Sequence, residues 1–446
     1  MANDPRPTTT LLLTIDKLIY GGNGLARLPA DDKGPGKAVF LPFVLEGERV
    51  EAEITEQKPG FARARATKIL EASPHRVAPA CPYFGQCGGC HYQHASYEHQ
   101  LQIKSAILRE TLRRIGKIEL AQEIRVHAAQ PWNYRNRTRL RVRPHPFVLG
   151  YNRLRWSELL AVEQCPISSP LINRAIAALW ELGRADKVSA DVTEIEFFAN
   201  ADDTKLLAEL TVQEKGWWHG RKSDVAQFVI GLRTAVPEVA GVAVFHAVGP
   251  GEIATEEIPA ELRDIFGAEH LQYAAGNASF QVTAGSFFQT NRFLIDQLVD
   301  LVSKDRSGDR ALDLYAGTGL FSVVLARNFR EVGAVESWPF SFRDLMHNCP
   351  RHVRLYQESV EDFLGGAHAE WDLVVVDPPR AGLGERVAEL LAASDTPRIT
   401  YVSCDPATLA RDLTVLMESG YRIEEVHLVD LFPQTFHIES VLQLTR

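Results

Sequence analysis

The stretch LDLYAGTGLFS, residues 312 to 322, decides the fold of the C-terminal part of the chain. An apolar strand ends near Asp313, and Gly317 and Gly319 allow the backbone to turn tightly beneath a ligand. About twenty residues later, Glu336 ends the next apolar segment, where its carboxylate can accept hydrogen bonds from a ribose. This spacing fits a site for a dinucleotide or for S-adenosylmethionine, and the glycine turn alone does not distinguish the two.

Apolar strands alternate with helical segments around this stretch, over residues 276–446. The candidate strands are ALDLY, VGAVE, VRLYQ, LVVVD, RITYVSC, RIEEVHLVD and ESVLQLT. Such alternation predicts a mostly parallel, doubly wound sheet, in which ligands bind at the carboxyl ends of the strands. We therefore expect a Rossmann-like domain over these residues.

Two of these strands end in residues that can carry chemistry. LVVVD continues as DPPRAG, a pattern common in methyltransferases, but Asp377 and Arg380 stand where enzymes that methylate exocyclic amines usually have asparagine and an aromatic residue. RITYVSC places Cys404 at the same sheet edge. A free cysteine is usually a small buried hydrophobe. The Asp-Pro that follows Cys404 at the mouth of the cleft favours a nucleophile instead.

A thiolate at this edge suits methylation of C5 of uracil or cytosine. C5 is a poor nucleophile, and addition of a thiolate to C6 converts the ring into an enolate whose C5 can attack a methyl group. The C5 proton must leave before the thiolate can, so the reaction needs a general base. Glu439, at the start of the final strand, is a candidate, although a solvated surface acid is an equally good interpretation of its position alone.

Residues 1–72 form short apolar segments separated by glycine turns. In RVEAEIT the apolar residues Val50, Ala52 and Ile54 alternate with Glu51 and Glu53, which is the pattern of a half-buried strand. A small OB-like β-barrel follows from this pattern. Many such barrels bind single-stranded nucleic acid, and many do not.

Residues 73–275 form a middle region in which basic residues concentrate. The whole chain has a net charge of −9, yet residues 101–155 hold 13 Lys+Arg and only 3 Asp+Glu. Alternation in the segment RTRLRVR would give a strand one face made of arginine. The residues on that face include Arg137, Arg139 and Arg141. We favour contact with phosphates over a merely solvated face.

Three cysteines lie within CPYFGQCGGC, residues 81 to 90. No segment reaches the apolar length of a membrane span, and the first residues do not form a secretory signal, so we expect a cytoplasmic protein with no membrane partner. Cysteines are kept reduced there, so a disulfide is not expected. The spacing of Cys81, Cys87 and Cys90 suits an iron-sulfur cluster at least as well as zinc.

Taken together, these segments resemble the RNA 5-methyluridine methyltransferase family over nearly the whole chain. The opening resembles a TRAM domain, and CPYFGQCGGCHYQH is similar to the family's iron-sulfur segment. SFFQTN, LDLYAGTG, DPPRAG, VSCDPATLARDL and FPQTFHIESV follow in the family's order. The resemblance implies three parts: a TRAM barrel (1–72), a central α+β domain with the iron-sulfur site (73–275) and a class I methyltransferase domain (276–446). The family fold is thus multidomain α/β.

The resemblance also implies roles for individual residues. Cys404 would be the nucleophile and Glu439 would remove the C5 proton. Phe287 would help to hold the flipped target base. The contacts to S-adenosylmethionine would come from Gln289, Tyr315, Glu336 and Asp377.

The fourth cluster ligand can be inferred from the cysteines that remain. Cys404 is needed as the nucleophile and Cys349 lies in the cofactor-binding domain, whereas Cys165 lies in the middle region with the other three. The family's pattern agrees, so we expect Cys165 to complete the ligand set of a four-iron, four-sulfur cluster.

The expected function is S-adenosylmethionine-dependent methylation of a uridine C5 in structured RNA, by a monomer. We favour ribosomal RNA over transfer RNA as the substrate. Cytidine-C5 methylation and a non-catalytic RNA-binding protein are the alternatives.

Overall fold

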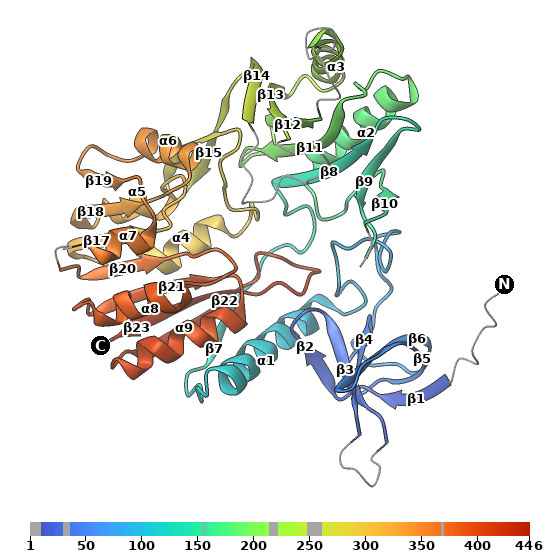
Figure 1. Ribbon diagram of the computed structural model, residues 1–446, viewed down its shortest axis with the longest axis horizontal. Coiled ribbons are helices and arrows are strands. Elements are labelled where there is room, and N and C mark those ends of the chain that lie inside the picture. The colour runs from blue at the N-terminus through green and yellow to red at the C-terminus, as the bar shows by residue number, and fades with distance from the viewer. Residues whose placement is uncertain (1–9, 30–35, 155–156, 214–221, 248–260, 367–369) are drawn as a thin grey trace.

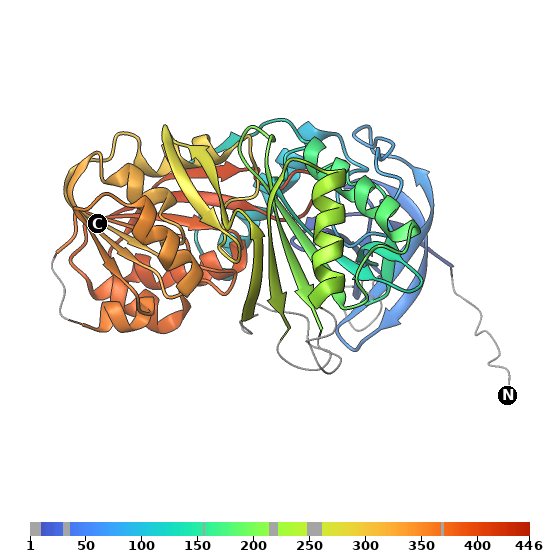
Figure 2. The same ribbon diagram turned by 90° about the horizontal axis from the view of Figure 1, so that it is seen from above.

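The computed structural model describes residues 10–29, 36–154, 157–213, 222–247, 261–366 and 370–446. These residues form a small barrel, a central sheet and a larger α/β region (Figure 1). Seen from above, the central sheet stands beside the α/β region, with a helix against its outer face (Figure 2). Among the described helices, none is long and apolar enough to cross a membrane.

The N-terminal region is a six-stranded sheet with the order β1-β5-β6-β4-β3-β2. Its strands are β1 (Thr10–Thr14), β2 (Lys17–Ile19), β3 (Asn23–Arg27), β4 (Ala38–Pro42), β5 (Arg49–Gln57) and β6 (Phe61–Glu71). Val50 and Ala52 of β5 are fully buried, as the alternating pattern predicts. Their side chains belong to a core that is separate from those of the other regions.

The central sheet has seven strands in the order β10-β9-β8-β11-β12-β13-β14. The strands are β8 (Arg137–Arg143), β9 (Val148–Asn152), β10 (Leu159–Ala161), β11 (Val192–Ala199), β12 (Leu206–Val212), β13 (Val239–His246) and β14 (Glu261–Gly267). Helices α2 (Pro170–Arg184) and α3 (Lys222–Ala235) contact this sheet. Ser169 caps α2 by accepting a hydrogen bond from the Ile172 amide at 3.3 Å. The two helices leave the opposite face of the sheet to the α/β region.

The α/β region contains an eight-stranded sheet with the order β19-β18-β17-β20-β21-β23-β22-β7. Its strands are β7 (Ile124–His127), β17 (Gly308–Leu314), β18 (Phe329–Val335), β19 (Val353–Tyr356), β20 (Leu373–Val376), β21 (Arg398–Ser403), β22 (Arg422–Val429) and β23 (Glu439–Thr445). Its helices are α4 (Ile295–Ser303), α5 (Leu320–Leu325), α6 (Pro339–Asn348), α7 (Val360–Gly365), α8 (Gly384–Ala393) and α9 (Pro406–Glu418). Only β23 runs antiparallel to both of its neighbours. A hairpin of β15 (His270–Ala275) and β16 (Ala278–Thr283) contacts both β12 and α6.

Part of the middle region packs differently from the expected division. Helix α1 (Tyr97–Ile115) lies against α9, and β7 pairs in parallel with β22 at the edge of the large sheet. The buried stripe of α1, including Ile107, Leu108 and Leu112, joins the hydrophobic core of the α/β region. The apolar face of α1 is therefore buried against a domain that begins more than 150 residues later in the sequence.

Candidate active site

The glycine turn after β17 is shaped for a ligand at the sheet edge. Tyr315, Gly317 and Gly319 all have positive φ, at 63°, 56° and 92°. A Cβ on Gly319 would lie 2.9 Å from Leu345 Cδ1, so only glycine fits there without displacement. The Gly317 amide donates to Glu336 Oε2 at 2.8 Å and the Trp338 amide donates to Oε1 at 2.6 Å. The carboxylate of Glu336 is thereby fixed beside the turn, where the sequence places a ribose contact.

Two aspartates adjoin this turn: Asp313 is fully buried and Asp377 is partly buried. Ser322 Oγ donates to Asp313 Oδ2 at 2.5 Å, and Gln289 Nε2 donates to Asp377 Oδ2 at 3.3 Å. Burial raises the pKa of each aspartate to about 7. The other oxygen of Asp313, Oδ1, is buried without a hydrogen-bond partner among the described residues. Carboxylates in such a place are stabilised by a cation, and a sulfonium ligand would supply one.

Cys404 and Glu439 are brought together by the pairing of β21 with β23. Ser403, the last residue of β21, pairs with Ser440 in an antiparallel register. Cys404 follows Ser403 and Glu439 precedes Ser440, so both residues adjoin the last pair of this register, and the negative charge of Glu439 acts on the Cys404 thiol. Two residues separated by 35 positions in sequence thus meet at one edge of the sheet.

The thiol and the carboxyl group of this pair are electrostatically coupled to Asp377. Burial, followed by the negative charges of Glu439 and Asp377, raises the pKa of Cys404 to about 12. Burial and Asp377 raise the pKa of Glu439 well above its usual range. The positive charge of Arg380 lowers both values. Without ligands, the site therefore favours a neutral thiol beside a neutral carboxyl group.

The barrel contributes a residue to this site that the sequence did not indicate. Tyr20 lies at the end of β2, and its hydroxyl donates to the Cys404 carbonyl at 3.5 Å. Its ring meets Phe436 edge to face, with the centroids 5.4 Å apart. Gly22, next to this tip, has φ +81°, and a Cβ there would lie 3.0 Å from the Cβ of His91. No local pattern marks Tyr20, because its partners are more than 380 residues away.

Helix α1 fixes the segment that leads into Glu439. Gln434 has a positive φ of 67°, and its backbone N–H donates to Gln100 Oε1 at 3.0 Å. Gln100 Nε2 donates in return to Gln434 Oε1 at 3.0 Å. The amides of His91 and Tyr92 both donate to the Gln434 carbonyl, at 2.8 and 2.9 Å. The cysteine segment and α1 therefore both hold the segment that precedes the candidate base.

All four predicted cluster cysteines line one cavity of about 260 Å³. They are Cys81, Cys87, Cys90 and Cys165, and each is a free thiol. The cavity is also lined by Arg135, whose Nε is buried without a partner among the described residues. Within the same residues, no three side chains of His, Cys, Asp or Glu form a group that could hold a metal ion.

The arginine face of β8 is partly neutralised by a carboxylate of the neighbouring strand, which the sequence did not indicate. Strand β11 sets Glu196 opposite Arg139, and Glu196 binds Arg137 Nη1 at 2.9 Å and Arg139 Nε at 2.6 Å. Arg141 Nη1 donates to Asn152 Oδ1 at 3.1 Å. The strand alternates as expected, but it is not a bare cationic face, because the neighbouring strand supplies carboxylates.

Phe287, which the resemblance implies as a contact to the target base, is 61% exposed.

Known families match both ends of the chain. The TRAM domain family matches residues 7–67, and the family described as tRNA (Uracil-5-)-methyltransferase matches residues 345–446. The chain also resembles the crystal structure of the Pyrococcus abyssi tRNA (uracil-54, C5)-methyltransferase in complex with S-adenosyl-L-homocysteine, with a TM-score of 0.74. At 23% identity, covering 97% of this chain and 100% of that one, this likeness concerns the fold.

Relatives are similar over almost their whole length. An RNA methyltransferase of Aquifex aeolicus is 33% identical over 97% of this chain and 98% of its own. The 23S rRNA (uracil(1939)-C(5))-methyltransferase RlmD of Alkalilimnicola ehrlichii is 31% identical over 99% of this chain and 97% of its own. The chain belongs to the RNA uracil-C5 methyltransferase family, and it is an S-adenosylmethionine-dependent enzyme.

Proposed function

We propose that the protein methylates C5 of a uridine in ribosomal RNA through a covalent bond between Cys404 and C6 of the base. The observation that carries this proposal is the strand register that ends at Ser403 and Ser440, because it brings the adjoining Cys404 and Glu439 to one sheet edge, where Glu439 and Asp377 both act on the thiol. The names of the relatives that act on uracil 1939 of 23S rRNA favour ribosomal RNA. A transfer-RNA uridine is the second candidate, because the matched family and the solved structure carry that substrate in their names.

S-adenosylmethionine supplies a methyl group on a positively charged sulfonium when it is bound. Gln289, Tyr315, Glu336 and Asp377 would hold it, since they surround the turn after β17 or the adjacent sheet edge. A cation near Asp377 would offset the negative charge that raises the pKa values of both Cys404 and Glu439, so that the thiol and the carboxyl group can lose their protons. The residues present therefore suit a cationic methyl donor.

The proposed reaction follows from the chemistry of these two side chains. The Cys404 thiolate adds to C6, and electrons move through the ring to give an enolate. Bound S-adenosylmethionine would supply the methyl group that passes to C5, and its sulfur would keep the electron pair of the broken bond. The Glu439 carboxylate then takes the C5 proton, and elimination at C6 restores the ring and frees the thiolate. The base must leave its stack for C6 to reach the thiolate, and exposed Phe287 is available to stack with it.

Trapping the adduct tests the nucleophile. RNA that contains 5-fluorouridine has no C5 proton to lose, so the wild-type protein should remain covalently attached to it after methyl transfer. Cys404→Ser should form no adduct, and Cys349→Ser, a matched cysteine substitution in the same domain, should form one. An adduct that survives Cys404→Ser would rule out this nucleophile.

Nucleoside analysis tests the substrate. Ribosomal and transfer RNA from cells with and without the gene should differ in 5-methyluridine in the large-subunit RNA alone. A difference in 5-methylcytidine would support the cytidine alternative, and a difference confined to transfer RNA would support the second candidate.

We also propose a four-iron, four-sulfur cluster held by the four cysteines of the 260 Å³ cavity. Such a cluster gives each cysteine a different iron, so the thiolates need not converge on one ion. Burial raises the pKa values of Cys87 and Cys90, and the positive charge of Arg135 acts in the opposite direction on both thiols. A buried guanidinium requires a compensating negative charge, and thiolate ligands would provide it.

Iron and acid-labile sulfide should be present in the purified protein and absent from Cys165→Ser. Cys349→Ser should retain both. Full iron content in Cys165→Ser would contradict the ligand set. We assign the cluster no redox step, because the methyl transfer needs no electron, and expect it to brace the segment that supports Gln434.

A further inference from the structure

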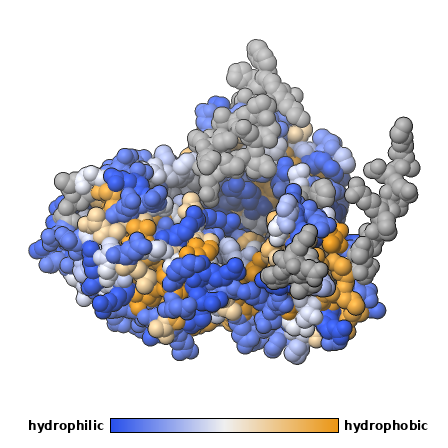
Figure 3. Space-filling model, turned by 60° about the horizontal axis from the view of Figure 1, so that its bottom comes forward, coloured by the Kyte–Doolittle hydropathy of each residue, from blue (hydrophilic) through white to orange (hydrophobic). Residues whose placement is uncertain are grey.

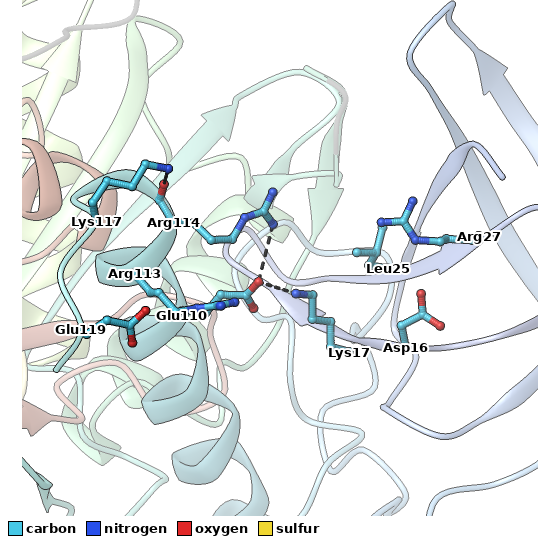
Figure 4. Close-up of a pocket in the computed structure, with 9 residues that line it drawn as sticks. All are labelled: Asp16, Lys17, Leu25, Arg27, Glu110, Arg113, Arg114, Lys117 and Glu119. Atoms are coloured by element: carbon cyan, nitrogen blue, oxygen red, sulfur yellow. Dashed lines mark hydrogen bonds and ion pairs between the residues drawn. The ribbon is translucent and has the colours of Figure 1, made fainter. Parts of the chain in front are cut away.

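A cavity of about 700 Å³ lies between the barrel and the end of helix α1, away from the residues assigned above. It is lined by Asp16, Lys17, Leu25, Arg27, Glu110, Arg113, Arg114, Lys117 and Glu119. Lys17 and Arg27 come from the barrel, and the other three cations come from α1 and the residue after its C-cap, on the opposite side (Figure 4). The charge of the lining is positive, although the whole chain has a net charge of −9.

The three acidic residues do not neutralise the cations equally. Glu110 is shared by Lys17 and by Arg114, at 3.5 Å from the latter, so this carboxylate ties the barrel to α1. Arg113 has no acidic partner among the described residues. In the part of the chain that the structure describes, Arg27 donates only to the Gly36 carbonyl, at 3.4 Å, and Lys117 only to the Arg114 carbonyl, at 2.9 Å. These last three side chains are exposed and can bind an anion.

Cations at the end of a helix also offset the helix dipole, which is a sufficient reason for Arg113 and Arg114. That explanation does not extend to Lys17 and Arg27, which belong to strands of another region. Two separate structural units present cations to one cavity. All lining residues except Leu25 are charged, so the site suits a charged, hydrated ligand rather than an apolar one. Figure 3 shows one face of the molecule, on which hydrophilic residues prevail with apolar residues between them.

Strand β2 contributes Lys17 to the cavity and leads to Tyr20 at the candidate active site. Lys17 lies in the cavity, and Tyr20, three residues further, reaches the Cys404 carbonyl. At about 3.3 Å per residue, this separation is roughly 10 Å. A nucleic-acid strand that leaves the active site along β2 would therefore enter the cavity after a short distance.

We propose that this cavity binds phosphates of the RNA strand that flanks the target uridine. The proposal rests on the proposed function for the presence of the target base at Cys404. Arg27, Arg113 and Lys117 are the phosphate contacts, and the Lys17–Glu110–Arg114 ion pairs keep the two walls at a fixed separation. Phosphate contacts set position and affinity rather than sequence preference.

The test is RNA binding as a function of salt concentration. The triple variant Arg27→Ser/Arg113→Ser/Lys117→Ser is compared with Arg184→Ser/Lys187→Ser/Arg330→Ser, which removes the same charge from exposed positions on other elements. The RNA is a ribosomal fragment with long flanks. Loss of three contacts to single-stranded RNA should lower the slope of log K against log salt by about 2 and raise Kd, because each contact contributes about 0.7. The control should match the wild type.

Two further measurements separate this proposal from the proposed function. At saturating RNA, kcat of the Arg27→Ser/Arg113→Ser/Lys117→Ser variant should equal that of the wild type. The difference in Kd should vanish with an RNA cut to the immediate neighbours of the target. Equal Kd and salt slope for this variant and the control variant would overturn the phosphate site, whatever the RNA product is. A lower salt slope in this variant, without 5-methyluridine formation by the wild type, would overturn the proposed function and leave the phosphate site in place.

Discussion

Lys104 of α1 and Asp430, which follows β22, form an ion pair in which both side chains are fully buried, with 2.5 Å between Nζ and Oδ1. The same ammonium group donates to the Phe432 carbonyl at 2.9 Å. Burial lowers the pKa of Lys104, and the negative charge of Asp430 partly offsets that shift. The pair anchors the segment that carries Glu439 to a helix from a different part of the chain.

Replacement of Lys104 by methionine should destabilise the protein. Lys104→Met leaves the Asp430 carboxylate buried without a counter-ion, which costs about 3–5 kcal/mol of unfolding free energy. Denaturant unfolding measures this loss. The double variant Lys104→Met/Asp430→Asn removes both charges and should recover most of the stability. A single variant as stable as the wild type would contradict a structural role for the pair.

Replacement of Glu439 by glutamine should stop the reaction after methyl transfer. The amide cannot accept the C5 proton, so the bond between Cys404 and C6 persists and protein–RNA adduct accumulates with ordinary uridine RNA. Denaturing electrophoresis detects the adduct. Cys404→Ser/Glu439→Gln should show none. Normal turnover by Glu439→Gln would exclude Glu439 as the base.

The reactivity of Cys404 should depend on the charge of Asp377. A negative charge raises a thiol pKa, so Asp377→Asn lowers the pKa of Cys404 and increases the thiolate fraction, about tenfold for each pKa unit. Alkylation of the cofactor-free protein by iodoacetamide at about pH 8 should therefore be faster in the variant.

The two proteins should converge as the pH falls below about 7, because Asp377 then becomes protonated in the wild type. Peptide mass mapping assigns the alkylated site, and Cys404→Ser corrects for the other thiols. Equal rates at high pH would show that Asp377 does not act on this thiol.

The Tyr20 hydroxyl should support formation of the adduct. Tyr20→Phe loses the hydrogen bond to the Cys404 carbonyl and keeps the ring beside Phe436, whereas Tyr20→Ala loses both. One hydrogen bond is worth about 0.5–1.5 kcal/mol, so the Phe variant should trap 5-fluorouridine RNA about 2–10-fold more slowly, and the Ala variant more slowly still. RNA affinity should not change. Arg65→Ala, on the exposed face of the barrel, is the control.

Much of the α/β region could be predicted from sequence. The seven expected strands correspond to β17–β23, because unbroken apolar runs such as LVVV are typical of strands that are buried on both faces. The glycine turn has the positive φ values that glycine favours, and Glu336 lies beside it. These features are set by short-range spacing, so they are visible in the chain itself.

The tertiary structure decided which distant residues meet. The position of Cys404 at a strand end is local, but its placement near Glu439 depends on the insertion of β23 between β21 and β22. The arginine strand has a clear period, and only the pairing with β11 revealed the carboxylate of Glu196. Tyr20 and Lys104 reach the site from segments that no local pattern connects with it.

The sequence by itself therefore determined the order of the regions, the strands of the large sheet and the candidate cysteine nucleophile. Only the tertiary structure decided that the barrel tip and helix α1 contribute to the surroundings of that cysteine. The physical reason is that periodicity specifies which face of an element is apolar, whereas the partner of that face is chosen by packing and pairing across hundreds of residues.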